Sequence, residues 1–191
     1  TNIGPVTYTL SYSGATSVSL GAGDVTLNKT GTANGTVSVT GSGTGSRTVT
    51  ISGITGDGTL GISIGAGTAS DAAGNLAPSA GPSATFAVDN TPPLITSISV
   101  PSTALTRGGP VNYTVSYADA SAVSLGAGNV ALTTTGTATG TVSVSGSGTS
   151  MRTVTVSGIT GNGTLGISIG AGTASDAIGN LAAAAGPSAT S

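Results

Sequence analysis

The chain of 191 residues has no Cys, His or Trp, and its sequence also contains no Glu and no Gln. Without Cys it can form neither a disulfide bond nor a thiolate zinc site. There is no His, Cys or Glu to serve as a general base or nucleophile, and the six acids present are all Asp residues scattered along the chain. We therefore expect that the chain is not an enzyme.

Charge is also scarce, because Asp, Glu, Lys and Arg together make up 5% of the residues, against roughly 25% in an ordinary globular protein. The four Lys and Arg residues and the formal net charge of −2 provide no basic surface for nucleic acid. No apolar run approaches the roughly 18 residues of a membrane-spanning helix. We expect neither nucleic-acid binding nor membrane insertion.

The sequence does contain one repeat, which is present in two copies. An ungapped offset of 105 residues aligns 1–86 with 106–191, and 64 of these 86 pairs are identical. A period of about a hundred residues corresponds to a small domain, since solenoid repeats run to 20–50 residues. We predict a first domain at 1–88, a Pro-containing linker at 89–93 and a second domain at 94–191.

Val, Ile, Leu and Thr alternate in short runs separated by Gly-rich turns, which is the pattern of half-buried strands. In the second copy we predict strands at 95–100, 111–117, 129–135, 140–145, 152–157 and 164–169, and the start of another near 188. In the first copy this last strand is predicted at 83–88. Seven short strands at this spacing are typical of a β-sandwich.

The alignment has unequal ends. The first copy has no counterpart of 94–105, which carries the first strand, and the second has no counterpart of 87–89. We expect an all-β protein of two tandem seven-stranded immunoglobulin- or fibronectin-III-like sandwiches, the first lacking strand A and the second lacking the end of strand G. An unpaired strand edge invites pairing with another chain, so edge-strand self-association is expected.

Several segments resemble immunoglobulin-like (Big-type) tandem repeats of large bacterial adhesins and other extracellular proteins. They are Ser-Asp-Ala-Ala-Gly-Asn at 70–75, Val-Asp-Asn-Thr-Pro-Pro at 88–93, Thr-Gly-Thr-Val-Ser-Val at 139–144 and Val-Ser-Gly-Ile-Thr-Gly at 156–161. The resemblance implies a sandwich fold, an extracellular or cell-surface location in a bacterium, neighbouring repeats of the same polypeptide as partners, and a spacer role. It also implies calcium at domain junctions.

Strand direction gives a candidate calcium site. Alternating strands place the loops 118–122 and 170–186 at the end of the second domain where the linker arrives. Calcium takes six to eight oxygen ligands. The residues that this end would offer are Asp89, Asp119, Asp176, Asn90 and Asn180. The alternative is turn chemistry, in which Asp and Asn side chains bind nearby backbone N–H groups. The acidic pair common after the second strand in the resembling family is absent here, where Ser13-Gly14 and Ala118-Asp119 stand.

The sequence therefore leaves two classes of function open. In the first, the repeats are a structural spacer or stalk of a large bacterial surface or secreted adhesin, stiffened by the paired prolines and by calcium at the junction. In the second, they are an adhesion module that binds a carbohydrate or another cell-surface or matrix ligand through its loop ends. Near-identical copies favour the spacer, because a dedicated binding domain usually differs from its neighbours.

Overall fold

The computed structural model describes residues 3–191, which form sixteen strands in antiparallel sheets and contain no α-helix. The all-β class predicted from the sequence is confirmed. The chain divides into two compact units, Thr1–Thr91 and Pro92–Ser191. This division lies inside the range predicted as linker, whose own bounds stay a prediction.

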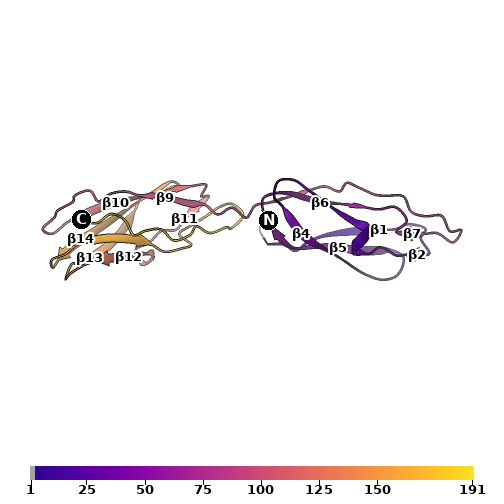
Figure 1. The fold of residues 1–191 in the computed structure, drawn as a ribbon, viewed down its shortest axis with the longest axis horizontal. Helices are drawn as coiled ribbons and strands as arrows, with labels where there is room; N and C mark the ends of the chain where they lie inside the picture. Colours follow the sequence, from indigo (N-terminus) through magenta and orange to yellow (C-terminus); the bar gives the residue numbers. More distant parts are fainter. Residues whose placement is uncertain (1–2) are drawn as a thin grey trace. The chain divides into compact units, whose positions relative to one another are not determined.

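The first unit contains two three-stranded sheets, in the orders β1-β5-β4 and β3-β6-β8, and a short pair, β2-β7. The strands of the larger sheets are β1 Val6–Ser11, β3 Val25–Lys29, β4 Asn34–Thr40, β5 Ser46–Thr55, β6 Gly58–Ile64 and β8 Phe86–Val88. The short pair consists of β2 Ser17–Val18 and β7 Ala69–Ser70. Figure 1 shows β1, β5 and β4 following one another across this unit.

The second unit has a four-stranded sheet, in the order β13-β14-β10-β9, and the pairs β12-β15 and β11-β16. Its strands are β9 Leu94–Ile98, β10 Val111–Ala118, β11 Ala122–Val123, β12 Val130–Thr134, β13 Thr139–Ser145, β14 Met151–Thr160, β15 Leu165–Ile169 and β16 Ala174–Ser175. In Figure 1 the strands β9 and β10 run along the same side of this unit.

Alternation along the strands explains how each unit buries its core. Along β5 the side chains of Val49 and Ile51 are fully buried, while the intervening Thr48 and Thr50 are partly exposed. They share one apolar cluster with Leu60 and Ile62 of the other large sheet. Both sheets of the first unit thus turn their apolar faces to a common core, because successive strand residues point to opposite faces. The second unit repeats this arrangement with Val154, Val156, Leu165 and Ile167.

The end of the second unit differs from the prediction made at residue 188. No strand follows β16 in this unit, although Ser188 N–H donates to the Ile167 carbonyl at 2.8 Å and Ser191 N–H to the Leu165 carbonyl at 2.9 Å. The segment therefore follows β15 through spaced hydrogen bonds, without the continuous ladder that defines a strand. In the first unit the corresponding strand β8 covers Phe86–Val88 only, shorter than the predicted 83–88.

An arginine closes one hairpin in each unit, buried in the first and half-buried in the second. Arg47 is 9% exposed, and its guanidinium donates to the carbonyls of Gly43 at 2.8 Å and Val18 at 3.0 Å. Arg152 makes the same bonds to Gly148 and Val123, both at 2.8 Å. Each arginine therefore ties the turn between two long strands to a short strand that belongs to another sheet.

Candidate functional site

The loops predicted to carry calcium ligands do lie side by side at one end of the second unit. The two-residue strands β11 and β16 pair with each other, and Ser121 N–H donates to the Ser175 carbonyl at 2.8 Å. Asp119 precedes the first of these strands and Asp176 follows the second. The prediction from strand direction, that these two loops share one end, is confirmed.

Asp176 is engaged by its own loop. Its Oδ1 accepts hydrogen bonds from the backbone N–H groups of Ile178, Gly179 and Asn180 at 2.7–2.9 Å. Its Oδ2 accepts one from Asn180 Nδ2 at 2.7 Å. A carboxylate offers about four lone-pair positions, and here four donors converge on the two oxygens. This is the arrangement that the turn-chemistry alternative describes.

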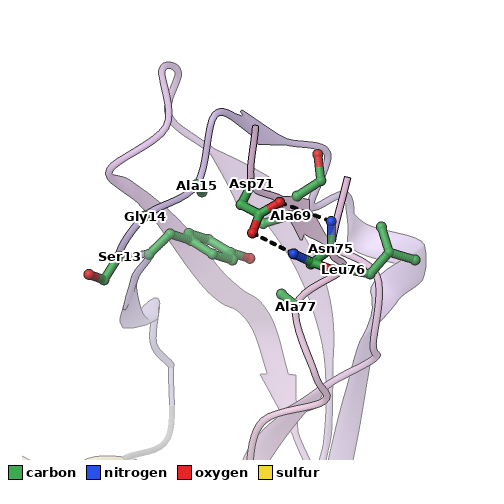
Figure 2. A pocket seen from close by; sticks show the side chains of 10 residues that line it. Ser13, Gly14, Ala15, Ala69, Asp71, Asn75, Leu76 and Ala77 are labelled. Carbon is green, nitrogen blue, oxygen red and sulfur yellow. Dashed lines mark hydrogen bonds between the residues drawn. The ribbon is translucent and has the colours of Figure 1, made fainter. Parts of the chain in front are cut away.

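The first unit contains the same kind of turn. Asp71 Oδ1 accepts the N–H groups of Ala73 at 2.8 Å and Asn75 at 2.9 Å, and Asn75 Nδ2 donates to Asp71 Oδ2 at 2.8 Å. Figure 2 shows the Asp71 carboxylate facing Asn75, with both hydrogen bonds between the pair drawn. The motif Ser-Asp-Ala-Ala-Gly-Asn at 70–75 and its counterpart at 175–180, which has Ile178 at the fourth position, therefore both fold into a carboxylate-centred turn.

These hydrogen bonds change the acidity of both carboxyl groups. The bonds from the side chain and backbone of Asn75 are the main reason that the pKa of Asp71 is lowered from its ordinary value. At Asp176 burial acts to raise the pKa, but the bonds from Asn180, Gly179 and Ile178 outweigh it and the pKa is again lowered. Donors to a carboxylate stabilise its charged form, so each turn is most stable when its Asp is ionised.

Asp119 has a different local role. Its φ is 59°, and it is the one residue other than glycine with a positive φ among the described residues 3–191. Gly14 holds the corresponding position of the first unit with a φ of 74°. Asp is among the few residue types that enter the left-handed region at modest cost. The shared requirement at this position is therefore a backbone conformation, which Gly meets in one unit and Asp in the other.

Asp89 and Asn90 belong to the first unit, where Asp57 accepts hydrogen bonds from the residues that follow β8. Asn90 N–H donates to Asp57 Oδ1 at 2.6 Å and Thr91 Oγ1 donates to Asp57 Oδ2 at 3.0 Å. Asn90 Nδ2 also donates to the Gly56 carbonyl at 2.7 Å, and Asp89 Oδ1 accepts the N–H of Thr91 at 3.0 Å. Asn90 and Thr91 are thus held to the first unit by three hydrogen bonds, and a fourth lies within the linker.

Sequence reasoning missed Asp57, because the second unit has Asn162 at this position and a role in only one copy looked unimportant. Its partners Asn90 and Thr91 lie 33 and 34 residues further along the chain, so no local sequence signal marks it. The hairpin that presents Asp57 is itself specific, since Gly56 has a φ of 72° and a Cβ there would collide with the Thr32 carbonyl.

For calcium, the unit that holds Asp119, Asp176 and Asn180 does not by itself provide a fitting cage. The oxygens of Asp176 already receive four donors, and an ion would have to displace them. Over residues 3–191 no group of three or more His, Cys, Asp or Glu side chains gathers as metal ligands do. The five-residue site that also includes Asp89 and Asn90 stays a prediction.

A hollow of about 190 Å³ lies beside the Asp71 turn, lined among others by Tyr12, Gly14, Asp71 and Leu76. Figure 2 shows Ser13, Gly14 and Ala15 on one side of it and Leu76 and Ala77 on the other. The tyrosine hydroxyl shares a hydrogen bond of 3.2 Å with Thr68 Oγ1. The Asp71 carboxylate and the Tyr12 hydroxyl, which both line the hollow, are therefore engaged in hydrogen bonds.

The chain was also compared with known proteins. No protein-family model, no curated protein and no solved structure matches it. Within the described part of the chain, no helix has the length and apolar character needed to cross a membrane.

Proposed function

We propose that the chain is a mechanical spacer, a pair of immunoglobulin-like β-sandwich repeats from the stalk of a large bacterial surface or secreted adhesin. Two near-identical units that each close their own apolar core support the repeat. The two sheets of each unit that contribute to one core support the sandwich. The motifs that resemble Big-type repeats support the extracellular bacterial setting.

The observation that carries the spacer is the fastened linker. A stalk has to transmit length, so its joints must resist bending. Here Asp57 fixes Asn90 and Thr91 to the first unit through two hydrogen bonds, and the next two residues are Pro92 and Pro93. Proline fixes φ near −65° and restricts the residue before it. Three consecutive positions from Thr91 to Pro93 therefore have little freedom.

Residual dipolar couplings of the whole chain in a weakly aligning medium test this proposal. A stiff joint makes both units report one alignment tensor, whereas a flexible joint gives each unit its own. We expect one tensor for the native chain and two for Asp57→Ala, because the variant loses the acceptor of two linker hydrogen bonds. Asn162→Ala removes the corresponding side chain of the second unit and should leave one tensor.

The alternative, an adhesion module that acts through its loop ends, predicts a different result. Its ligand would perturb amide resonances at 13–15 and 71–77, or at their counterparts 118–120 and 176–182. A panel of glycans and matrix peptides titrated into the labelled chain tests this. Two independent tensors in the native chain together with a saturable shift at these loops would replace the spacer by the binding module.

A further inference from the structure

The outward side of the sheet β1-β5-β4 carries one chemical type of side chain. Because strand residues alternate between faces, the residues between the buried Val49 and Ile51 and their equivalents on β1 and β4 point away from the core. Where the three strands pair without a register shift, all ten outward positions are Ser or Thr, two residue types that make up about a third of the chain. This hydroxyl face consists of Thr7, Thr9, Ser11, Thr36, Ser38, Thr40, Ser46, Thr48, Thr50 and Ser52.

The register of the strands arranges these side chains in rows across the sheet. In an antiparallel pair, Cβ atoms directly opposite each other are about 4.5–5.5 Å apart. Thr is β-branched and therefore stiff at χ1, so its hydroxyl and methyl groups are held in a nearly fixed array. The two central rows, each read across β1, β5 and β4, are Thr7, Thr50 and Ser38, and Thr9, Thr48 and Thr40.

The hydroxyl groups of this face are not used inside the protein. Over residues 3–191, none of the ten hydroxyls makes a hydrogen bond to another protein group. The side of the unit formed by β3 and β6 differs, because Thr30 shares a hydrogen bond with Thr59 at 2.8 Å and Ser63 accepts one from Asn28 at 2.8 Å. The hydroxyl face therefore offers all of its side-chain donors and acceptors to the outside, with methyl groups between them and no charge.

The spacing within a row is close to that of water molecules in ice. Each water molecule in ice has four neighbours in tetrahedral directions, at the O···O distance of about 2.75 Å that an O–H···O hydrogen bond favours. Two molecules bonded to the same neighbour are then about 4.5 Å apart. Hydroxyls fixed at nearly this separation can replace water molecules at the surface of the crystal.

We propose that the hydroxyl face of the first unit binds ice. The hydroxyls of the two central rows hydrogen-bond to water molecules of the crystal surface, and the threonine methyl groups lie between those molecules. Neighbouring strands are rotated by about 20–25° relative to each other, so a flat crystal surface meets the central rows and not the whole face. The inference goes beyond the spacer and does not depend on it.

A periodic solid of water fits this face better than other ligands do. Sites for small molecules are concave and combine apolar or aromatic side chains with a few placed polar groups, whereas the hydroxyl face repeats one polar group. Crystalline polysaccharides are also periodic, but the face has no aromatic side chain on which a sugar ring could stack. Charged groups would hold a shell of liquid water, and the face has none.

The second unit has the same sheet but an interrupted array. Its corresponding positions hold Met151 in place of Ser46 and Asn112 in place of Thr7, and Met151 is 56% exposed. Asn112 Oδ1 also accepts a hydrogen bond from Thr155 Oγ1 at 2.7 Å, which removes that hydroxyl from the outward set. We therefore assign ice binding to the first unit.

Thermal hysteresis of the whole chain, the gap between the melting and freezing temperatures of a single ice crystal in its solution, tests the proposal. We expect a gap that grows with protein concentration, and a crystal with facets. Thr48→Lys places a long, strongly hydrated cation in a central row and should remove most of the gap. Two matched changes should leave it unchanged: Thr26→Lys at an exposed position of β3, and Thr153→Lys, the counterpart in the second unit.

A second variant keeps the proposal testable if Thr48→Lys fails to fold, since Thr48 is only partly exposed. Thr40 lies in the same row at an exposed position of β4, and Thr40→Lys should also remove most of the gap. Amide spectra of each variant, compared with those of the native chain, show that the fold is retained.

Three results would overturn the proposal. The first is a native chain that produces no gap and does not shape the crystal. The second is a folded Thr40→Lys variant that keeps the native gap, or a loss as large in Thr26→Lys or Thr153→Lys. The third is co-sedimentation with microcrystalline cellulose or chitin that Thr40→Lys abolishes, in a chain without thermal hysteresis, which would make a crystalline polysaccharide the occupant.

Discussion

The strands β1 and β10 show how one sequence pattern is buried to different depths. Tyr113 and Val115 of β10 are 1% and 0% exposed, whereas their counterparts Tyr8 and Leu10 in β1 are only half-buried. On one side, each strand pairs in the same register with the equivalent long strand of its own unit, β1 with β5 and β10 with β14. The difference lies on the other side, where β9 covers one unit and nothing in the described residues covers the other. Burial at these positions thus depends on the neighbouring strand as well as on the residue.

The largest effect should come from truncating the matched tyrosines. Tyr113→Ala removes a fully buried ring whose hydroxyl donates to the Leu165 carbonyl at 2.9 Å, and large-to-small core changes of this kind cost about 3–5 kcal/mol. Tyr8→Ala, at a half-buried site, should cost about 1–2 kcal/mol. Urea unfolding followed by unit-resolved amide signals measures both. Equal losses would show that the open edge does not weaken the packing of the first unit.

The second largest loss of stability should come from removing the matched arginines. It should be equal in the two units and therefore serves as a reference for comparing them. Arg47→Ala and Arg152→Ala each remove charge-assisted bonds to carbonyls at a turn and at a short strand. We expect a loss of about 1–3 kcal/mol in the unit that carries the change, since the carbonyls lose their donors. The same urea experiment applies, with Lys29→Ala on an exposed strand end as the control. A large difference between the two arginine variants would contradict the shared role.

A smaller, pH-dependent effect should also appear in both units. The pKa values of Asp71 and Asp176 are lowered in the folded state, so their ionised forms stabilise it. This contribution is present above the unfolded value of about 3.9 and is lost as the pH falls through the lower folded pKa. The protection of the Asn75 and Asn180 amides, measured as their exchange rate relative to the intrinsic rate at the same pH, should therefore fall below about pH 4. Asp71→Asn should remove the pH dependence in the first unit only.

The smallest expected effect is that of calcium. Because the oxygens of Asp176 already accept four hydrogen bonds within its loop, we expect millimolar calcium to leave the melting temperature of the chain essentially unchanged. Calorimetric titration of the native chain and of Asp119→Ala measures this directly. A single site that is present in the native chain and lost in the variant would instead establish the predicted junction site and add an ion to the stiffened spacer.

The long strands could be predicted closely from the sequence. The range 111–117 became β10 at Val111–Ala118, and 140–145 became β13 at Thr139–Ser145. In both, alternation between apolar and polar residues is a local signal, and a short strand with one buried face cannot shift by one residue without exposing that face. The start of β14 was also close, but its far end at Thr160 lies beyond the predicted 157.

The candidate site could be predicted only in part, because its contacts depend on the tertiary structure. That the loops bearing Asp119 and Asp176 meet followed from strand direction, and the pair β11-β16 shows it. The partners of each carboxylate did not follow. The four donors on Asp176 come from the turn that its own loop adopts, and Asp57 meets Asn90 across 33 residues of sequence. Such contacts depend on where a hairpin ends in space.

The sequence by itself determined the repeat, the all-β class and the apolar face of most strands, because these are properties of composition and period along the chain. Only the tertiary structure decided which carbonyls each arginine holds and that Asp57 holds the linker. Those features depend on distances between residues far apart in sequence. Two copies that share 64 of 86 aligned residues can therefore bury the same strand to different depths.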